Sequence, residues 1–156
     1  MNKVENAISV CENHLMLTNA FGTEIEAFLT RYLIIYTSSY FEETLEEAFI
    51  NRAMRTGDVF VIEYFKSEIP QKMKSVGITK LSNFVRKFGT DFVERFSNEI
   101  IGNLAIEVTS YGNIIRNRHM VAHETQGESQ MTFNELVNAY KDSIKIINKM
   151  LDILND

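Results

Sequence analysis

Apolar residues recur at every third or fourth position along most of the chain, the spacing that places them on one face of a helix. One such series follows Thr23 and Glu26, which have the spacing of a helix-capping box, and we expect one long helix that continues to about Phe49. Its apolar face would hold Ile25, Phe28, Leu29, Tyr32, Ile35, Tyr36, Ser39 and Tyr40. Aromatic rows at this spacing are typical of a core or a helix interface.

Shorter helices are predicted on both sides of this one. Residues 1–19 place Val4, Ile8, Cys11, Leu15 and Met16 on one face. Residues 59–65 resume the helical spacing after a Thr-Gly break, and no partner strand is nearby. We predict a linker over residues 70–77, a helix over 81–88 that Gly89 ends, and a short amphipathic helix over 92–96.

Two further helices complete the pattern. One runs from Ile100 to about Ala122, and the last begins at a second capping box formed by Thr132 and Glu135. Between them, residues 124–131 are expected to form a polar loop. A chain of 156 residues suits one domain. We therefore predict a single all-α domain over residues 1–156, a helical bundle of about five to seven helices.

Composition supports this picture and narrows the class of protein. Apolar residues make up 45 % and charged residues 24 %, a globular balance, and one proline with seven glycines is too few for many tight hairpins. The lone Cys11 excludes an internal disulfide and suits a reducing compartment. The first residues, MNKVENAISVCENH, are interrupted by polar side chains. We therefore expect a cytoplasmic protein with no signal peptide and no membrane span.

Charge is distributed unevenly along the chain. The net charge of −5 argues against coating of nucleic acid by the whole surface. Residues 1–50 hold two basic and eight acidic groups, whereas residues 71–95 hold six basic and two acidic ones. A local basic surface can bind a polyanion, although a solvated helix face explains the same pattern.

The side chains best suited to chemistry lie between residues 114 and 123, where two of the three histidines and two of the seven arginines occur. The helix dipole accounts for cations at a helix C-terminus but not for two histidines. In a helix His119 and His123 share a face and Arg116 lies near it, whereas Arg118 is roughly 140° from His123 unless the helix end unwinds. A guanidinium with a neutral-pH imidazole suffices for metal-free RNA cleavage.

The segment Arg118–His123 resembles the R-x(4–6)-H motif of HEPN domains, with Val121-Ala122 before the motif histidine. The segment resembles most closely the HEPN-like nucleases near the RiboL-PSP-HEPN group, and the early aromatic-rich helix (Phe28 to Phe49) and the Phe88–Phe92 segment agree with the pattern of that group. This resemblance implies an α-helical bundle, commonly a dimer in which two motifs share one cleft. Many such domains are metal-independent endoribonucleases of toxin–antitoxin or other defence systems.

Carried over residue by residue, the resemblance implies a catalytic set of Arg118, His119 and His123. Arg118 would position the phosphate, His123 would act as general base or acid, and His119 would orient either group or the substrate. Arg116 satisfies the longest spacing of the motif and is the alternative motif arginine. We assign Arg116 and Asn117 to substrate binding.

Other candidate sites are weaker. Cys11 and His14 have a C-x2-H spacing that lacks a second pair, and His119 with His123 and Glu124 lacks a third histidine. The glutamates within residues 42–47 favour a solvated helix face. We therefore expect neither a metal nor a cofactor.

These observations predict a metal-independent endoribonuclease of a toxin or defence system that leaves a 2′,3′-cyclic phosphate. RNA is the expected substrate, and a second copy of the chain is the expected partner. A cognate antitoxin or other defence-system protein is a further candidate partner. The alternative is a non-catalytic HEPN-like module that binds RNA or a protein partner through the same surface.

Overall fold

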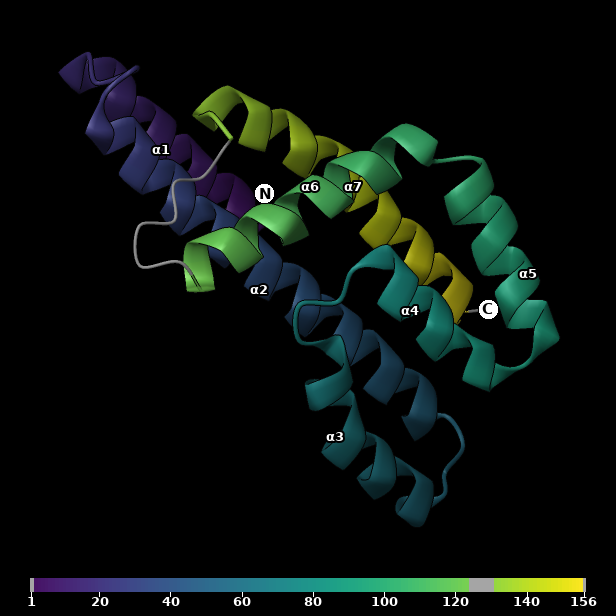
Figure 1. Cartoon of the computed structure of the whole chain (residues 1–156). Coiled ribbons are helices and arrows are strands. Elements are labelled where there is room, and N and C mark those ends of the chain that lie inside the picture. The colour runs from purple at the N-terminus through teal and green to yellow at the C-terminus, as the bar shows by residue number, and fades with distance from the viewer. Residues whose placement is uncertain (1, 124–130, 156) are drawn as a thin grey trace.

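The computed structural model of the chain describes residues 2–123 and 131–155, and it contains helices and no strand within these ranges. The all-α prediction is confirmed (Figure 1). The elements are α1 (Lys3–Thr18), α2 (Glu24–Met54), α3 (Val59–Met73), α4 (Ile78–Val85), the 3-10 turn η1 (Arg86–Phe88), α5 (Thr90–Phe96), the π-helical turn η2 (Ser97–Gly102), α6 (Ala105–His123) and α7 (Phe133–Asn155). None of the described helices is both long and apolar enough to cross a bilayer.

Helix α2 is the central helix of the fold and contacts α1, α3, α6 and α7. Its 31 residues correspond to a length of about 46 Å. Helix α7 runs parallel to it and is held at both ends. At one end the Phe133 amide donates to the Glu26 carboxylate (3.1 Å), and at the other Arg52 donates to the Leu154 carbonyl oxygen (2.7 Å). Helices α1 and α3 lie along opposite halves of α2 (Figure 1).

The two predicted capping boxes have different outcomes. The box at Thr132 and Glu135 is confirmed, because the Thr132 amide donates to the Glu135 carboxylate (2.8 Å) and the Glu135 amide donates to the Thr132 hydroxyl (3.3 Å). The first box is only half formed. Thr23 caps the Ile25 amide (3.2 Å), but the Glu26 carboxylate accepts hydrogen bonds from Gly22 and from α7 instead of from Thr23.

The apolar stripe predicted for the core side of α2 is only partly buried. Four of its members are between 42 % and 64 % exposed: Ile25, Phe28, Tyr32 and Ile35. The buried side carries Leu33, Ile34, Phe41, Leu45 and Phe49, and the helix continues beyond Phe49 to Met54. Helix α2 is apolar on two adjacent faces, so the positions of its neighbours decide which face is covered.

Three other boundaries or faces differ from the prediction. Pro70 lies inside α3 rather than in a linker, and the helix loses one hydrogen bond near its end. The helix expected from Ile100 begins at Ala105, because a π-helical turn occupies the preceding residues. Met16 is exposed, since it lies one position past the buried series that ends at Leu15.

The turn between α3 and α4 is fixed by two long-range hydrogen bonds. Ser75, which has a left-handed backbone conformation with a φ of 47°, donates its amide to the Glu42 carboxylate on α2 (2.7 Å). The fully buried Tyr111 on α6 donates its hydroxyl to the Val76 carbonyl oxygen (2.6 Å). The basic segment around this turn is therefore attached to the helix that carries the predicted motif.

Candidate functional site

The predicted motif occupies the last two turns of α6. Earlier in this helix Tyr111, Ile114 and Ile115 are buried, because they face α2 and α7. The Tyr111 ring stacks on Phe41 of α2, with a centroid distance of 5.5 Å. This packing fixes the helix axis and so decides which residues after position 115 can reach the surface.

Helix α6 remains regular through His123. Positions 116, 119 and 123 are spaced by three and four residues, so their backbones lie along one strip of the helix. Arg116 and His119 on this strip are exposed. The side chain of His123 lies outside the described residues, as do residues 124–130, which hold Glu124 and all but the last residue of the predicted polar loop.

Arg118 occupies a different side of the same helix. Since the helix does not unwind before His123, the Arg118 backbone stays roughly 140° around the axis from it. The Arg118 side chain is half-buried. Within one copy of the chain, the helix therefore groups Arg116, rather than Arg118, with the two histidines.

Asn113 and Asn117 organise the start of this strip. The Arg116 guanidinium donates to the Asn113 side-chain oxygen (3.1 Å), and the side-chain amide of Asn117 donates to the backbone carbonyl oxygen of Asn113 (2.9 Å). Asn117 is only 7 % exposed. Its burial and its hydrogen bond to the backbone suit a residue that supports the helix. Asn113 was not identified from the sequence, because a single asparagine on a helix gives no signal of its partner.

Tyr111 and Glu42 are two further residues that sequence reasoning missed as contributors to this region. Burial, with the nearby Glu42 carboxylate, raises the pKa of the Tyr111 phenol above its usual range, so the hydroxyl stays protonated as a donor. Tyr111 is one of the buried apolar positions of α6. Its hydroxyl bond could not be predicted, because the acceptor is 35 positions away along the chain.

The groove between α6 and α7 carries two carboxylates, both of which belong to α7. A hollow of about 380 Å³ lies there, and its lining includes Ser110, Asn113, Glu135 and Asp142. Hydrogen bonds from the amide and hydroxyl of Thr132 lower the pKa of Glu135, which keeps this carboxyl ionised near neutral pH. The Asp142 carboxylate accepts a hydrogen bond from Ser110 (3.0 Å). The Asp142 carboxylate also pairs with Lys145 (3.2 Å), which offsets its charge. Glu135 still disfavours phosphate in this hollow, so the basic side is the more favourable approach for a polyanion.

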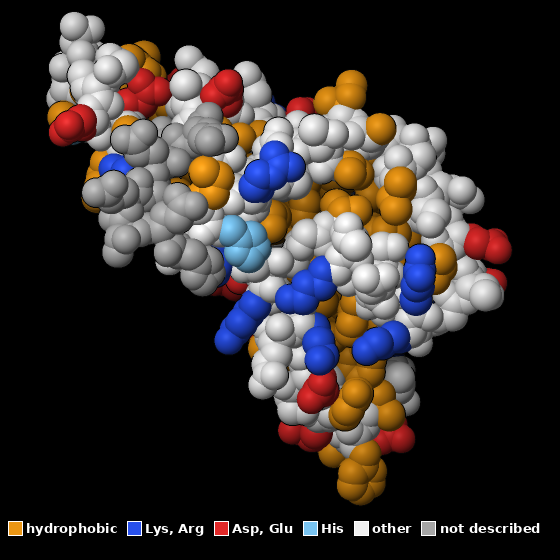
Figure 2. All heavy atoms as spheres, in the orientation of Figure 1, with side chains coloured by type: hydrophobic (Ala, Val, Ile, Leu, Met, Phe, Trp, Pro, Cys, Tyr) orange, Lys and Arg blue, Asp and Glu red, His pale blue; other side chains and the backbone are white. Residues whose placement is uncertain are grey.

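The surface next to α6 on the side of α3 and α4 is basic. Figure 2 shows Lys and Arg side chains gathered over the end of α3 and over α4, on the face that carries a histidine above the C-terminal part of α6. The basic segment that the sequence identified thus lies on the same face as part of the motif helix. The hydrogen bonds of Ser75 and Val76 to α2 and α6 account for this placement.

The other candidate sites do not converge. Cys11 is buried in α1, where burial raises the pKa of its thiol, while His14 is exposed. Within the described ranges, no three His, Cys, Asp or Glu side chains are grouped closely enough to hold a metal ion. Glu42 is half-buried and bonded to Ser75, and Glu43 is exposed and paired with Lys3.

Comparison with known proteins places these features in a family. The profile of the RiboL-PSP-HEPN family matches residues 1–156, which is the entire chain. Neither the curated proteins nor the solved structures include a significant match. HEPN domains are helical, and the described residues of this chain form helices and no strand. The chain therefore belongs to the RiboL-PSP-HEPN family.

Proposed function

We propose that this chain is a metal-independent endoribonuclease of a toxin or defence system. The observation that carries the proposal is the exposed strip at the end of α6, where Arg116 and His119 share a helix side with the backbone of His123. Membership of the HEPN family supports an RNA-related role. The basic surface beside this strip supports a polyanionic substrate.

The proposed reaction is a transesterification within one RNA strand. A histidine removes the proton of a 2′-hydroxyl, and that oxygen attacks the adjacent phosphorus. An arginine stabilises the charge that builds on the phosphate oxygens. The bond from phosphorus to the 5′-oxygen then breaks, and an imidazolium protonates the leaving oxygen. The products are a 2′,3′-cyclic phosphate and a 5′-hydroxyl, and no co-reactant is consumed.

Within this proposal His123 is the general base or acid, and His119 orients it or the substrate. Arg118 and Arg116 compete for the role of phosphate-binding arginine. The family motif favours Arg118, whereas the regular helix and the exposure of Arg116 favour Arg116. Asn117 contributes to substrate binding by holding the last turns of α6 in place.

The proposal includes a homodimer. The exposed stripe formed by Ile25, Phe28, Tyr32 and Ile35 repeats at three and four residues, the spacing of a seam between two helices. It lies on the N-terminal half of α2, and the C-terminal end of α6 is directed toward that half (Figure 1). Pairing through this stripe would bring the α6 motifs of two copies toward one cleft. One histidine could then remove the 2′-hydroxyl proton while another protonates the leaving 5′-oxygen.

The deciding experiment is RNA cleavage by the purified protein in EDTA, with analysis of the product ends. We expect His123→Ala to slow cleavage by about 10²–10⁴-fold, since it removes the proposed acid–base group. The control is His14→Ala, because His14 is an exposed histidine on α1, outside the motif. Arg116→Ala and Arg118→Ala are compared in parallel, and the larger loss identifies the phosphate-binding arginine.

Two results would contradict the proposal. A folded His123→Ala protein that retains more than about a third of the wild-type rate removes the acid–base role. An inactive wild-type protein that still binds RNA favours the non-catalytic module instead. Growth arrest on expression that His123→Ala relieves would support a toxin, and a co-purified protein that suppresses cleavage would identify the antitoxin.

A further inference from the structure

A second feature of the basic face is a pocket of about 330 Å³ between α3 and the α4–η1 segment. Four aromatic side chains line it: Tyr64, Phe65, Phe84 and Phe88. Lys72 and Lys87 also border it. Its volume is within the range of small-molecule sites, and it is large enough for one nucleobase.

The aromatic walls pack against one another and are incompletely covered. Phe88 packs against Phe84 and Phe65, with ring centroids 5.4 Å and 5.9 Å apart. Phe49 of α2 supports the group from below, with its centroid 4.9 Å from Phe84. All three pocket phenylalanines are only half-buried, and Tyr64 is 62 % exposed. These rings therefore retain surface on which a flat π-system can stack.

The two lysines supply positive charge beside these rings. Lys87 is exposed and makes no ion pair or hydrogen bond with the described residues. Lys72 is exposed and has one long contact with Glu68 (3.8 Å), a pair that contributes little in water. Glu68 also lines the pocket and opposes an anion there. The balance of two lysines against one glutamate favours an anionic group.

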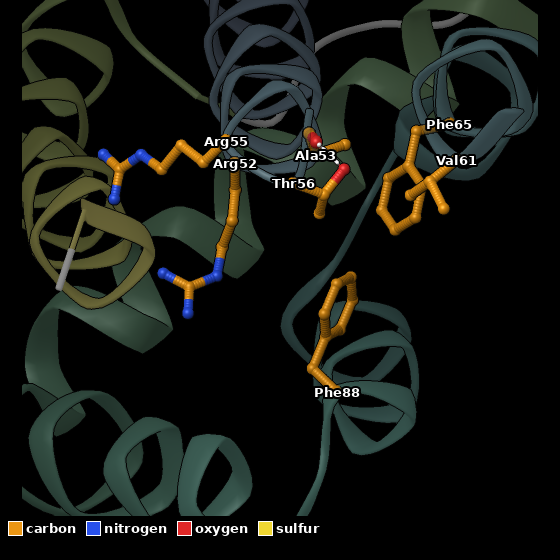
Figure 3. Close-up of a pocket in the computed structure, with 7 residues that line it drawn as sticks. All are labelled: Arg52, Ala53, Arg55, Thr56, Val61, Phe65 and Phe88. Carbon is orange, nitrogen blue, oxygen red and sulfur yellow. Dashed lines mark hydrogen bonds between the residues drawn. The ribbon is translucent and has the colours of Figure 1, made fainter. Parts of the chain in front are cut away.

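A neighbouring hollow of about 440 Å³ provides a useful contrast (Figure 3). It shares Phe65 and Phe88 with the pocket, but its cations are Arg52 and Arg55. Both arginines extend toward α7, where they donate to the Leu154 and Asn155 carbonyl oxygens, each at 2.7 Å. Because both guanidinium groups already donate to carbonyl oxygens at the end of α7, this hollow is less suited to a phosphate.

Aromatic rings beside exposed lysines are the combination by which proteins bind single-stranded nucleic acid. We propose that this pocket binds one unpaired base of single-stranded RNA, stacked on the phenylalanine and tyrosine rings, with its phosphate beside Lys72 and Lys87. The link between this binding and RNA cleavage rests on the proposed function. Figure 2 shows the hydrophobic strip between the Lys and Arg side chains on the face shared with the end of α6. The pocket would hold a strand whose other part reaches the motif.

The test is equilibrium binding of a fluorescent single-stranded 2′-O-methyl RNA in EDTA, measured by anisotropy. This strand lacks the attacking hydroxyl, so binding is measured independently of cleavage. Tyr64→Ala should weaken binding at least about fivefold through lost stacking. Its matched control is Phe60→Ala, because Phe60 is another aromatic residue of α3, 88 % exposed, and lies outside the pocket.

The contribution of the two lysines to RNA binding is measured separately, through the salt dependence of the affinity. Lys72→Ala/Lys87→Ala should lower the slope of log affinity against log salt by about 0.7 per lysine. Lys66→Ala is the control, since Lys66 is an exposed α3 lysine that also pairs with a glutamate but lies outside the pocket. Glu68→Gln should tighten binding about twofold, because it removes an anion and keeps an acceptor.

Each outcome is decisive. Wild-type protein that does not bind the strand, or pocket variants that bind as tightly as their controls, would overturn the pocket. A free nucleoside monophosphate that binds more tightly than the strand would also overturn it and indicate a nucleotide-binding site. Pocket-dependent binding without cleavage of unmodified RNA would reject only the proposed enzymatic function. Cleavage with unchanged binding in the variants would reject only the pocket.

Discussion

The two halves of α2 carry similar apolar and aromatic residues in different environments. In the C-terminal half Phe41, Leu45 and Phe49 are fully buried. In the N-terminal half Phe28 and Tyr32 remain largely exposed, although α1 and α7 lie alongside. Hydrophobicity along the helix is therefore not a guide to burial. The C-terminal half stabilises the fold and supports the α3–α4 pocket. In the N-terminal half Leu33 and Ile34 are also buried, and only the face that carries Phe28 and Tyr32 is the surface we assign to a second copy.

The largest effect is expected from the C-terminal half. Phe49→Ala should reduce the free energy of unfolding by about 3–5 kcal/mol, since it leaves a cavity beneath Phe84 and Phe88. Phe60→Ala is the control and should change it by less than about 0.5 kcal/mol, because Phe60 is exposed. Urea unfolding measures both. Equal losses in the two variants would show that the aromatic cluster does not stabilise the fold.

The exposed face of the N-terminal half should affect association more than folding. Phe28→Asp/Tyr32→Asp should weaken a dimer by at least about 30-fold, because buried aromatic anchors at interfaces contribute about 2 kcal/mol or more each. Sedimentation equilibrium measures the change, and unfolding midpoints extrapolated to low concentration should stay near wild type. Phe60→Asp, at the far end of the molecule, is the control. A wild-type protein that remains monomeric would reject this interface.

A smaller effect is expected where α6 holds the α3–α4 turn. Tyr111→Phe should cost about 1–3 kcal/mol, since it leaves the Val76 carbonyl without its buried donor. Tyr64→Phe serves as the control, because Tyr64 is exposed. If the turn positions the basic face, Tyr111→Phe should also weaken RNA binding, and unchanged binding would separate this contact from the surface.

The smallest effect concerns the cap of α7 and depends on pH. The lowered pKa of Glu135 means that its carboxylate stabilises the folded chain while it is ionised. That contribution is present above the unfolded-state pKa of about 4.3 and is lost as the pH falls through the lower folded-state value. Glu135→Gln should therefore be slightly less stable than wild type at pH 7, by less than about 1 kcal/mol, and equal to it in acid. A constant difference in thermal unfolding at all pH values would contradict this assignment.

Much of the fold was predictable because helix spacing and caps depend on nearby residues. The buried face of α1 up to Leu15, the box at Thr132 and the end at Gly89 all appear in the structure. Pro70 was misassigned because the packing of α3 against α2 outweighs the hydrogen bond that a proline removes from a helix, and this packing has no local signal in the sequence. The apolar stripe of α2 was misassigned because two of its faces are apolar and local sequence does not say which one is covered.

The sequence by itself determined the all-α class and the concentration of arginine and histidine in residues 116–123, since both are properties of short segments. Only the tertiary structure decided which part of α2 stays exposed and how the basic segment lies beside α6. The bonds responsible, from Ser75 to Glu42 and from Tyr111 to Val76, join residues 33 and 35 positions apart. Contacts over such separations depend on how whole helices pack, and no local pattern encodes them.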